Sequence, residues 1–313
     1  MGSATRAWQL AFYGIDFGEG DRILTSRAEY GANYVAFLQM QKRTGCKIAV
    51  IPDDASGVTD PSALEEMIDE RSKLIAITWI PTNGGLINPA IEIGRVARAH
   101  NIPYLLDACQ AAGQLPIDVN EIGCDFLTAA GRKWLRGPRA TGFLYVRRHM
   151  LDRFEPAVID HDGARWASAS SYELKPNARR YEVFERAPAL QLGLGMAASY
   201  TLQLGLEPIR ERVDNLAQTL RGELAGLSGI SVQDLGVEKA GLVTFSHERI
   251  GASDIKSALG QKNINVSVST PDNTLLDSTA RALPDLVRAS PHYYNSDDEI
   301  AAFLDAVREI CVG

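Results

Sequence analysis

Asp107 stands at the end of a short apolar run, Pro103-Tyr-Leu-Leu-Asp107, which is typical of a buried strand. In open α/β sheets, ligands bind at the carboxyl ends of the strands. A carboxylate in that position is poorly solvated, so it needs a cationic partner or good hydrogen-bond donors. Two roles are therefore open for Asp107 from this stretch: a ligand contact, or the N-cap of the helix that follows.

Lys133 follows a second apolar run and lies among small residues and glycines in the stretch 128–142. Glycines allow the backbone to come close to a ligand or to a neighbouring strand. Arg132, Arg136 and Arg139 flank this lysine. A solvated basic loop, or a surface that contacts phosphate, is therefore an alternative to catalysis by Lys133.

The combination of Asp107 and Lys133 favours catalysis, because a lysine and an aspartate at neighbouring strand ends are what a pyridoxal phosphate site requires. The lysine amine forms an imine with the cofactor aldehyde. The aspartate keeps the ring nitrogen protonated through a charge-assisted hydrogen bond, so that the ring can accept electrons from a substrate carbanion. The freed amine of Lys133 is then the natural base for the first proton transfer at the substrate Cα.

A parallel sheet covered by helices would position these side chains, and residues 22–146 carry the matching pattern of short apolar runs alternating with amphipathic stretches. We predict strands over 22–26, 47–51, 73–78, 103–107, 125–129 and 142–146. We predict helices over 4–13, 32–43, 61–71 and 89–100. Proline near the first turn supports the last two helices, since its missing N–H costs least there.

From about residue 190 the pattern changes to two long helical stretches followed by an α+β assortment. The predicted helices are 190–204, 207–224, 252–261 and 297–312, and the predicted strands are 230–233, 242–246, 265–269 and 286–290. The fold class is therefore α/β, with a large, mostly parallel-sheet domain over 1–205 and a smaller α+β domain over 206–313. We expect the cofactor to lie between these two domains.

Composition excludes several classes of function. Lys and Arg total 32 against 39 Asp and Glu, a net charge of −7, and no basic stripe is present, so nucleic acid is not an expected partner. No apolar stretch approaches the roughly 20 residues that span a bilayer, and the first residues lack the pattern of a leader, so we expect a cytoplasmic protein without membrane contact. The four cysteines are scattered without metal-ligand or disulfide spacing, which predicts no metal site and inert, buried thiols.

Five motifs together resemble the class V aminotransferase family of fold-type I pyridoxal phosphate enzymes, over almost the full chain from Ala4 to Ile310. This family also contains cysteine desulfurases, C–S lyases, kynureninase and isopenicillin-N-epimerase-like proteins. The motifs span residues 106–118 (Leu-Asp-Ala-Cys-Gln-Ala-Ala-Gly-Gln-Leu-Pro-Ile-Asp), 123–126 (Gly-Cys-Asp-Phe), 131–138 (Gly-Arg-Lys-Trp-Leu-Arg-Gly-Pro), 142–146 (Gly-Phe-Leu-Tyr-Val) and 288–295 (Arg-Ala-Ser-Pro-His-Tyr-Tyr-Asn).

The resemblance implies roles for residues around the cofactor ring. It makes Lys133 the Schiff-base lysine and Asp107 the partner of the ring nitrogen, with Gln110 near the ring hydroxyl. Tyr30 occupies the position at which many members stack a histidine on the ring, and its alternative role is that of a core tyrosine. Thr82 lies where desulfurases carry an asparagine beside the ring oxygen.

The resemblance also implies a phosphate site at Ala4 and Thr5, where the N-terminus of a helix favours an anion. Arg132 stands where relatives use a histidine for the same phosphate. Ala130 and Ala187 depart from the family pattern, because many relatives carry hydroxyl residues at these positions. These departures weaken the prediction of the phosphate contacts but not that of the imine chemistry.

Three residues are assigned to the substrate by the same resemblance. The guanidinium of Arg288 suits bidentate capture of an α-carboxylate, with a surface salt bridge as the alternative. Asn83 lies next to Thr82. His161 belongs to a segment similar to the epimerase-like branch, and its alternative is a solvated loop histidine.

The leading hypothesis is an amino transfer on an α-amino acid, with cysteine or cystine C–S cleavage or epimerisation as the alternatives. Cysteine desulfurase is disfavoured, because residues 265–277, where desulfurases carry a nucleophilic cysteine, contain none. A non-catalytic truncated paralogue or partner-binding scaffold is the alternative of a different class, because Met1 lies only a few residues ahead of Ala4 and the usual N-terminal arm is expected to be missing. The resemblance also implies a homodimer.

Overall fold

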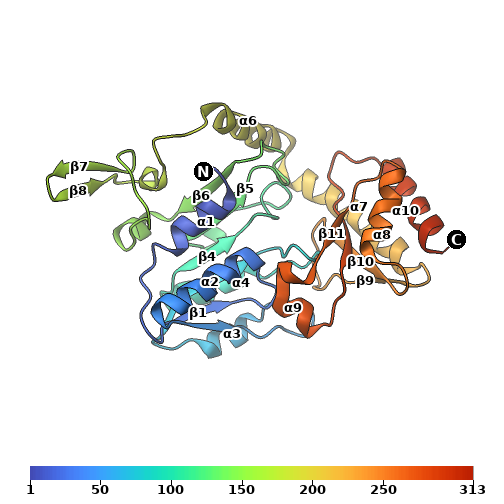
Figure 1. Cartoon of the computed structure of the whole chain (residues 1–313), viewed down its shortest axis with the longest axis horizontal. Coiled ribbons are helices and arrows are strands. Elements are labelled where there is room, and N and C mark those ends of the chain that lie inside the picture. The colour runs from blue at the N-terminus through green and yellow to red at the C-terminus, as the bar shows by residue number, and fades with distance from the viewer. Residues whose placement is uncertain (313) are drawn as a thin grey trace.

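The computed structural model describes residues 1–312 and has a central sheet of six strands in the order β2-β1-β3-β4-β5-β6 (Figure 1). The strands are β1 (Arg22–Thr25), β2 (Lys47–Val50), β3 (Ser72–Thr78), β4 (Tyr104–Asp107), β5 (Phe126–Ala130) and β6 (Gly142–Val146). Neighbouring strands from β2 to β5 pair in parallel, and only β6 runs antiparallel, against β5. The mostly parallel α/β fold predicted from the sequence is confirmed.

Helices cover both faces of this sheet, and the alternation of strand side chains explains how. On one face, Leu105 and Phe126 pack against α1 (Ala4–Phe12) and α2 (Gly31–Thr44). On the other face, Leu106 and Leu127 pack against α3 (Pro61–Met67) and α4 (Ala90–Ala99). All four strand residues are at most 1% exposed, so each strand is apolar on both sides, as expected for a covered parallel sheet.

A second sheet of four antiparallel strands lies beyond the first, in the order β11-β12-β10-β9. Its strands are β9 (Ile230–Val232), β10 (Val243–His247), β11 (Ser267–Ser269) and β12 (Leu286–Ala289). The helices α7 (Leu206–Ala225), α8 (Ala252–Gln261) and α10 (Asp297–Cys311) pack on this sheet around a core that includes Phe245 and Phe303 (Figure 1). The short helix α9 (Leu275–Ala280) connects β11 to β12.

Helix α7 joins the two parts of the chain, because it contributes to both cores. Ile209 and Val213 pack with the core of the six-stranded sheet, whereas Leu216 and Leu220 belong to the core of the four-stranded sheet. Gly205, with a φ of +86°, separates α7 from α6 (Pro188–Leu204). The domain boundary that we predict after residue 205 falls at this glycine and remains a prediction.

The sequence patterns located almost every regular element, often to within one residue. They missed the hairpin formed by β7 (Ala164–Ser168) and β8 (Ser171–Leu174), the one-turn helix α5 (Val119–Ile122), the short helix α9 and the short 3₁₀ helices. The hairpin extends away from both sheets (Figure 1), and most of its side chains are exposed, so it lacks the alternation of apolar residues that marks a half-buried strand. Within residues 1–312, no helix combines the length and the apolar character needed to cross a membrane.

Candidate active site

A cavity of about 460 Å³ lies between the two sheets and brings together most of the residues singled out from the sequence. Its position follows from the fold, because the carboxyl ends of β3, β4 and β5 all open toward the four-stranded sheet. The predicted site residues that line it are Tyr30, Thr82, Gln110, Arg132, Lys133 and Arg288.

Lys133 enters the cavity from the loop that follows β5. A tight turn shapes this loop: the Gly137 N–H donates to the Gly131 carbonyl at 2.7 Å, and the Arg136 N–H donates to the Lys133 carbonyl at 2.9 Å. A Cβ on Gly131 would lie 2.2 Å from Thr141 Oγ1, so no larger residue fits there without movement. The loop therefore needs glycine in order to present Lys133.

Asp107 ends β4 and is only 5% exposed. The Asn33 side-chain amide donates to its Oδ2 at 3.0 Å, and the Cys109 N–H donates to its Oδ1 at 2.9 Å. Burial raises the pKa of the Cys109 thiol well above its ordinary value; the Asp107 charge adds to this shift and the Lys133 charge opposes it. The half-buried Cys109 thiol therefore lies within electrostatic reach of both Asp107 and Lys133.

Gln110 follows β4 and is held by the residue next to Lys133. The Trp134 indole N–H donates to Gln110 Oε1 at 3.2 Å. With its oxygen used in this way, the amide nitrogen of Gln110 is the end that can donate to an acceptor in the cavity.

Arg288 reaches the cavity from β12 and contacts the loop after β3. Its Nη1 donates to Thr82 Oγ1 at 2.7 Å and to the Thr82 carbonyl at 2.9 Å, while its Nε is buried without a partner. Burial, together with the nearby Arg132, lowers the pKa of Arg288, and Tyr30 opposes this shift. A buried guanidinium with an unused donor is expected to take an anionic ligand.

The donor set fits pyridoxal phosphate together with an amino acid. Lys133 supplies an amine, Asp107 a buried carboxylate, and Arg132 and Arg288 supply cations for a phosphate and a carboxylate. Tyr30 is the N-cap residue of α2 and adds an aromatic ring to the cavity wall. These groups come from separate segments and converge only in the folded chain.

The predicted phosphate residues Ala4 and Thr5 begin α1, where the Ser3 hydroxyl accepts a hydrogen bond from the Arg6 N–H at 3.0 Å. A Cβ on Gly142 would lie 2.6 Å from the Ala4 nitrogen, which shows how closely this helix end approaches the start of β6. Gly142 pairs with Ala130 at the end of β5, so this helix end lies near the loop that carries Arg132 and Lys133. Ala4 and Thr5 are not among the residues that line the cavity.

Asn83 and His161, the other two residues assigned to the substrate, lie outside the cavity lining. Asn83 is 4% exposed, and its amide donates to the Thr270 carbonyl at 2.9 Å, which ties the loop after β3 to the segment after β11. His161 is exposed, and its ring stacks at 4.7 Å from Phe184 in the region of the β7–β8 hairpin. The structure therefore brings neither side chain together with Lys133.

His292 is a cavity residue that the sequence reasoning did not single out, although it lies within the motif that begins at Arg288. Its ring stacks on Trp134 with centroids 4.9 Å apart, and its Nε2 lies 3.1 Å from the Trp134 carbonyl. Burial lowers the pKa of His292 to about 4, so its ring is neutral near pH 7. Its position within the family motif at residues 288–295, five residues before the acidic start of α10, could have identified it as a site residue.

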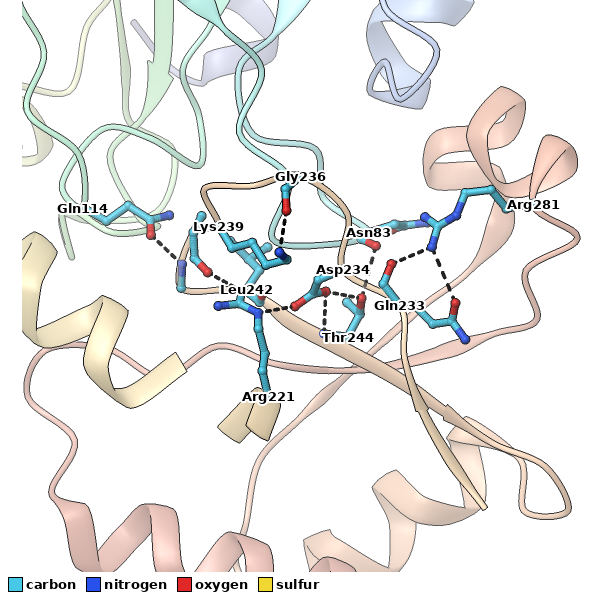
Figure 2. A network of polar contacts seen from close by, with 12 residues as sticks. Asn83, Gln114, Arg221, Gln233, Asp234, Gly236, Lys239, Leu242, Thr244 and Arg281 are labelled. Atoms are coloured by element: carbon cyan, nitrogen blue, oxygen red, sulfur yellow. Dashed lines mark hydrogen bonds and ion pairs between the residues drawn. The ribbon is translucent and has the colours of Figure 1, made fainter. Parts of the chain in front are cut away.

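A network of polar contacts holds the four-stranded sheet against the six-stranded one (Figure 2). Arg221 on α7 and Asp234 form an ion pair at 2.7 Å with side chains 11% and 0% exposed. Asp234 also accepts from the Thr244 N–H at 3.0 Å and from its hydroxyl at 2.6 Å. Gln114 accepts from the Gly241 N–H at 2.9 Å, so the segment before β10 is anchored to the large sheet.

This network fixes the site because β10 pairs with β12, the strand that carries Arg288. Thr244 faces Arg288 in that pairing, and the Thr244 hydroxyl lies 3.4 Å from the Asn83 carbonyl. Arg288 is therefore held in the cavity by contacts with Thr82 and, through β10, with Asn83, two neighbouring residues of the loop after β3.

The comparisons with known proteins agree with this geometry. The model of the family described as aminotransferase class-V matches residues 1–303. The chain therefore belongs to the class-V aminotransferase family, whose cofactor is pyridoxal phosphate. The resemblance and the cofactor inferred from the sequence are both confirmed.

Among its relatives, a probable cysteine desulfurase of Methanothermobacter thermautotrophicus is 28% identical over 304 residues, covering 95% of this chain and 75% of the relative. A probable cysteine desulfurase of Halalkalibacterium halodurans is 32% identical over 298 residues, covering 93% of this chain and 71% of the relative. The apo structure of a cysteine desulfurase from Thermococcus onnurineus superimposes with a TM-score of 0.93 at 26% identity, covering 100% of this chain and 78% of that one.

These relatives contradict our expectation that cysteine desulfurase is disfavoured. That expectation depended on the absence of cysteine from residues 265–277, whereas the similarity to desulfurases extends over more than nine-tenths of the chain. The structure also places the Cys109 thiol within reach of the charges of Asp107 and Lys133. Cys109 follows Asp107 by two residues but is not among the residues that line the cavity. Amino transfer, our leading hypothesis, is supported only by the family name.

Proposed function

We propose that this protein cleaves the carbon–sulfur bond of cysteine or of a cysteine-derived amino acid, using pyridoxal phosphate bound through Lys133. The observation that carries the proposal is the meeting of Lys133 and Arg288 in one cavity, in a chain whose relatives are named cysteine desulfurases. When bound, the cofactor supplies an electron sink for the bond cleavages at the substrate. The chain supplies binding, orientation and proton transfer.

Arg288 would bind the substrate α-carboxylate. Nη1 of Arg288 already donates to Thr82. Nε, which has no partner, and Nη2 would therefore donate the two parallel hydrogen bonds to the carboxylate. The Thr82 hydroxyl accepts from Arg288, which leaves its own hydrogen for the ring oxygen of the cofactor. Threonine can therefore take the place of the asparagine expected there.

Lys133 would move the proton at the substrate Cα once its amine is free of the cofactor. Asp107 would hold the proton of the ring nitrogen, Gln110 would donate to the ring oxygen, and Tyr30 would cover one face of the ring. These roles are proposals that rest on the family motif; Gln110 and Tyr30 line the cavity together with Lys133, whereas Asp107 is not among its lining residues.

Cleavage can follow two balanced routes that differ in the fate of the carbon skeleton. If a thiol takes the sulfur, cysteine and the thiol give alanine and a persulfide. If the β-substituent leaves, cysteine and water give pyruvate, ammonia and hydrogen sulfide. We propose Cys109 as the thiol of the first route, since Cys46, Cys124 and Cys311 are buried. Burial keeps the Cys109 thiol protonated, so a base must take its proton before the sulfur attacks.

We also propose that the protein forms a homodimer through α6. All but one of the residues of this helix lie at least partly exposed, and its large apolar side chains include Leu192 at 72% and Met196 at 69% exposure. Exposed apolar surface of this kind is typical of an interface. The α6 surface, defined by Leu192, Met196, Tyr200, Leu202 and Leu204, would be covered by a second copy of the chain.

The test is to supply cysteine to the protein loaded with pyridoxal phosphate, in the presence of dithiothreitol, and to quantify sulfide, alanine and pyruvate. Sulfide with alanine, or sulfide with pyruvate, supports carbon–sulfur cleavage and identifies the route. Lys133→Ala should abolish product formation, whereas Lys42→Ala, on the exposed side of α2, should not change it. Amino transfer to a keto acid without release of sulfide would overturn the proposal.

A further inference from the structure

Glu29 is a buried carboxylate to which the proposed chemistry gives no role. It lies between the end of β1 and the start of α2 and is 3% exposed. Within residues 1–312, no lysine or arginine forms a salt bridge with it. An unpaired buried carboxylate is costly, so its retention at this place needs an explanation.

Neutral donors surround the carboxylate of Glu29 in place of a cation. Thr78 donates its N–H to Oε2 at 2.9 Å and its hydroxyl to Oε1 at 2.5 Å. The hydroxyls of Thr25 and Ser26 lie 3.2 and 3.4 Å from Oε2. These contacts hold the carboxylate in one orientation at the ends of β1 and β3.

Asn33 connects Glu29 to the proposed cofactor site. Its amide nitrogen donates to Glu29 Oε1 at 2.8 Å and to Asp107 Oδ2 at 3.0 Å. An amide nitrogen has two hydrogens, so one is available for each carboxylate. Asn33 is 4% exposed, which shields both hydrogen bonds from water.

We propose that Glu29 is a positioning residue for the cofactor, which acts through Asn33 to orient Asp107 and to strengthen its hold on the proton of the ring nitrogen. This inference rests on the proposed site at Lys133 and Asp107. The orientation follows from the contacts, because Asn33 fixes Oδ2 and the Cys109 N–H fixes Oδ1. The stronger hold follows from this orientation, because a fixed carboxylate oxygen makes a better-aligned, charge-assisted hydrogen bond to the ring N–H.

The charge state of Glu29 can change near neutral pH. Burial raises its pKa to about 7, the hydrogen bonds from Thr78 and Asn33 oppose this rise, and the Asp107 charge adds to it. The titratable groups that face it are Asp107 and the phenol of Tyr104, both on β4. From β1, β3 and α2 it meets only hydroxyl and amide groups.

The test uses pyridoxal phosphate labelled with ¹⁵N in the ring, bound to the full chain, with the ring ¹⁵N chemical shift and the cofactor dissociation constant as readouts. Glu29→Gln should lower the pH at which the ring nitrogen loses its proton by about one unit. The difference from the unmodified protein should appear mainly above pH 7, where Glu29 is ionised. Asn33→Ser, which removes the link but leaves the carboxylate, should cause a similar shift, and the double variant should add little.

Thr25→Val is the matched control, because it removes a neutral contact to Glu29 Oε2 but leaves the link through Asn33, which contacts Oε1. An unchanged ring ¹⁵N shift in Glu29→Gln and Asn33→Ser would overturn the inference, and so would an equal change in Thr25→Val, which indicates simple anchoring. If labelled cofactor does not attach to Lys133 in the unmodified protein, the proposed site fails first. That outcome is distinguishable, because the unmodified protein then gives no bound signal.

Discussion

Replacement of Asp234 by alanine should destabilise the packing of α7 on the four-stranded sheet. The side chain of Asp234 is 0% exposed and accepts hydrogen bonds from Arg221 and from two groups of Thr244. Its loss leaves the Arg221 Nε, on a side chain 11% exposed, without its anionic partner. Breaking a buried pair from one side costs about 3–5 kcal/mol, so we expect a loss of this size in the free energy of unfolding.

The assay is urea unfolding of Asp234→Ala, Arg221→Ala and the double variant, followed by far-ultraviolet circular dichroism. The double variant should lose less stability than the two single losses together, because each single change strands a partner in the interior. Glu309→Ala breaks the more exposed pair with Lys262 and serves as the control, with an expected loss of less than about 1 kcal/mol. Losses below about 1 kcal/mol in both single variants at the buried pair, or strictly additive losses, would show that Arg221 and Asp234 do not depend on each other in the interior.

Four further outcomes are expected. Burial lowers the pKa of His292 to about 4, so its ring is neutral in the folded protein, and its contribution to stability is complete above its ordinary pKa of 6.5 and is lost as the pH falls toward 4. His292→Gln should therefore reduce the dependence of the free energy of unfolding on pH between 6.5 and 4. An unchanged dependence in this variant would count against the prediction. Thr82→Val should raise the KM for cysteine about fivefold, because one hydrogen bond to Arg288 is lost, whereas Thr82→Ser should retain the KM of the unmodified protein. Equal KM values in the unmodified protein and both variants would exclude a role of the Thr82 hydroxyl in holding Arg288. Leu192→Glu on the α6 surface should shift sedimentation toward monomer, and a monomeric unmodified protein would contradict the proposed dimer. Cys109→Ala should lower alanine formation from cysteine at least tenfold, and an undiminished rate would exclude Cys109 as the sulfur acceptor.

Much of the fold follows from the sequence, because local patterns and global packing agree. The apolar runs that end at Asp107 and begin at Gly142 each fit strands buried in a covered sheet, and these are β4 and β6. The β7–β8 hairpin could not be found in the same way, since Trp166 is 79% exposed and no buried face imposes alternation there. A hairpin that protrudes leaves little periodic signal.

The candidate site was predictable only where residue type and strand end coincide. Lys133 and Asp107 satisfy this condition, and the family motif adds Arg288. The contacts of Asn33 with Glu29 and Asp107 were not predictable, because they join side chains 4 and 74 positions apart through geometry that no short pattern encodes. The error about desulfurase chemistry has a different cause, since the absence of cysteine from residues 265–277 was given more weight than a similarity that extends over almost the whole chain.

In the proposed function, Lys133 is the residue that binds the cofactor covalently. The most direct measurement is borohydride reduction of the protein loaded with pyridoxal phosphate, followed by proteolysis and mass spectrometry of the labelled peptide. We predict one modified lysine, Lys133, and no covalent label after Lys133→Ala. A label on another lysine in the unmodified protein, or none at all, would contradict the account.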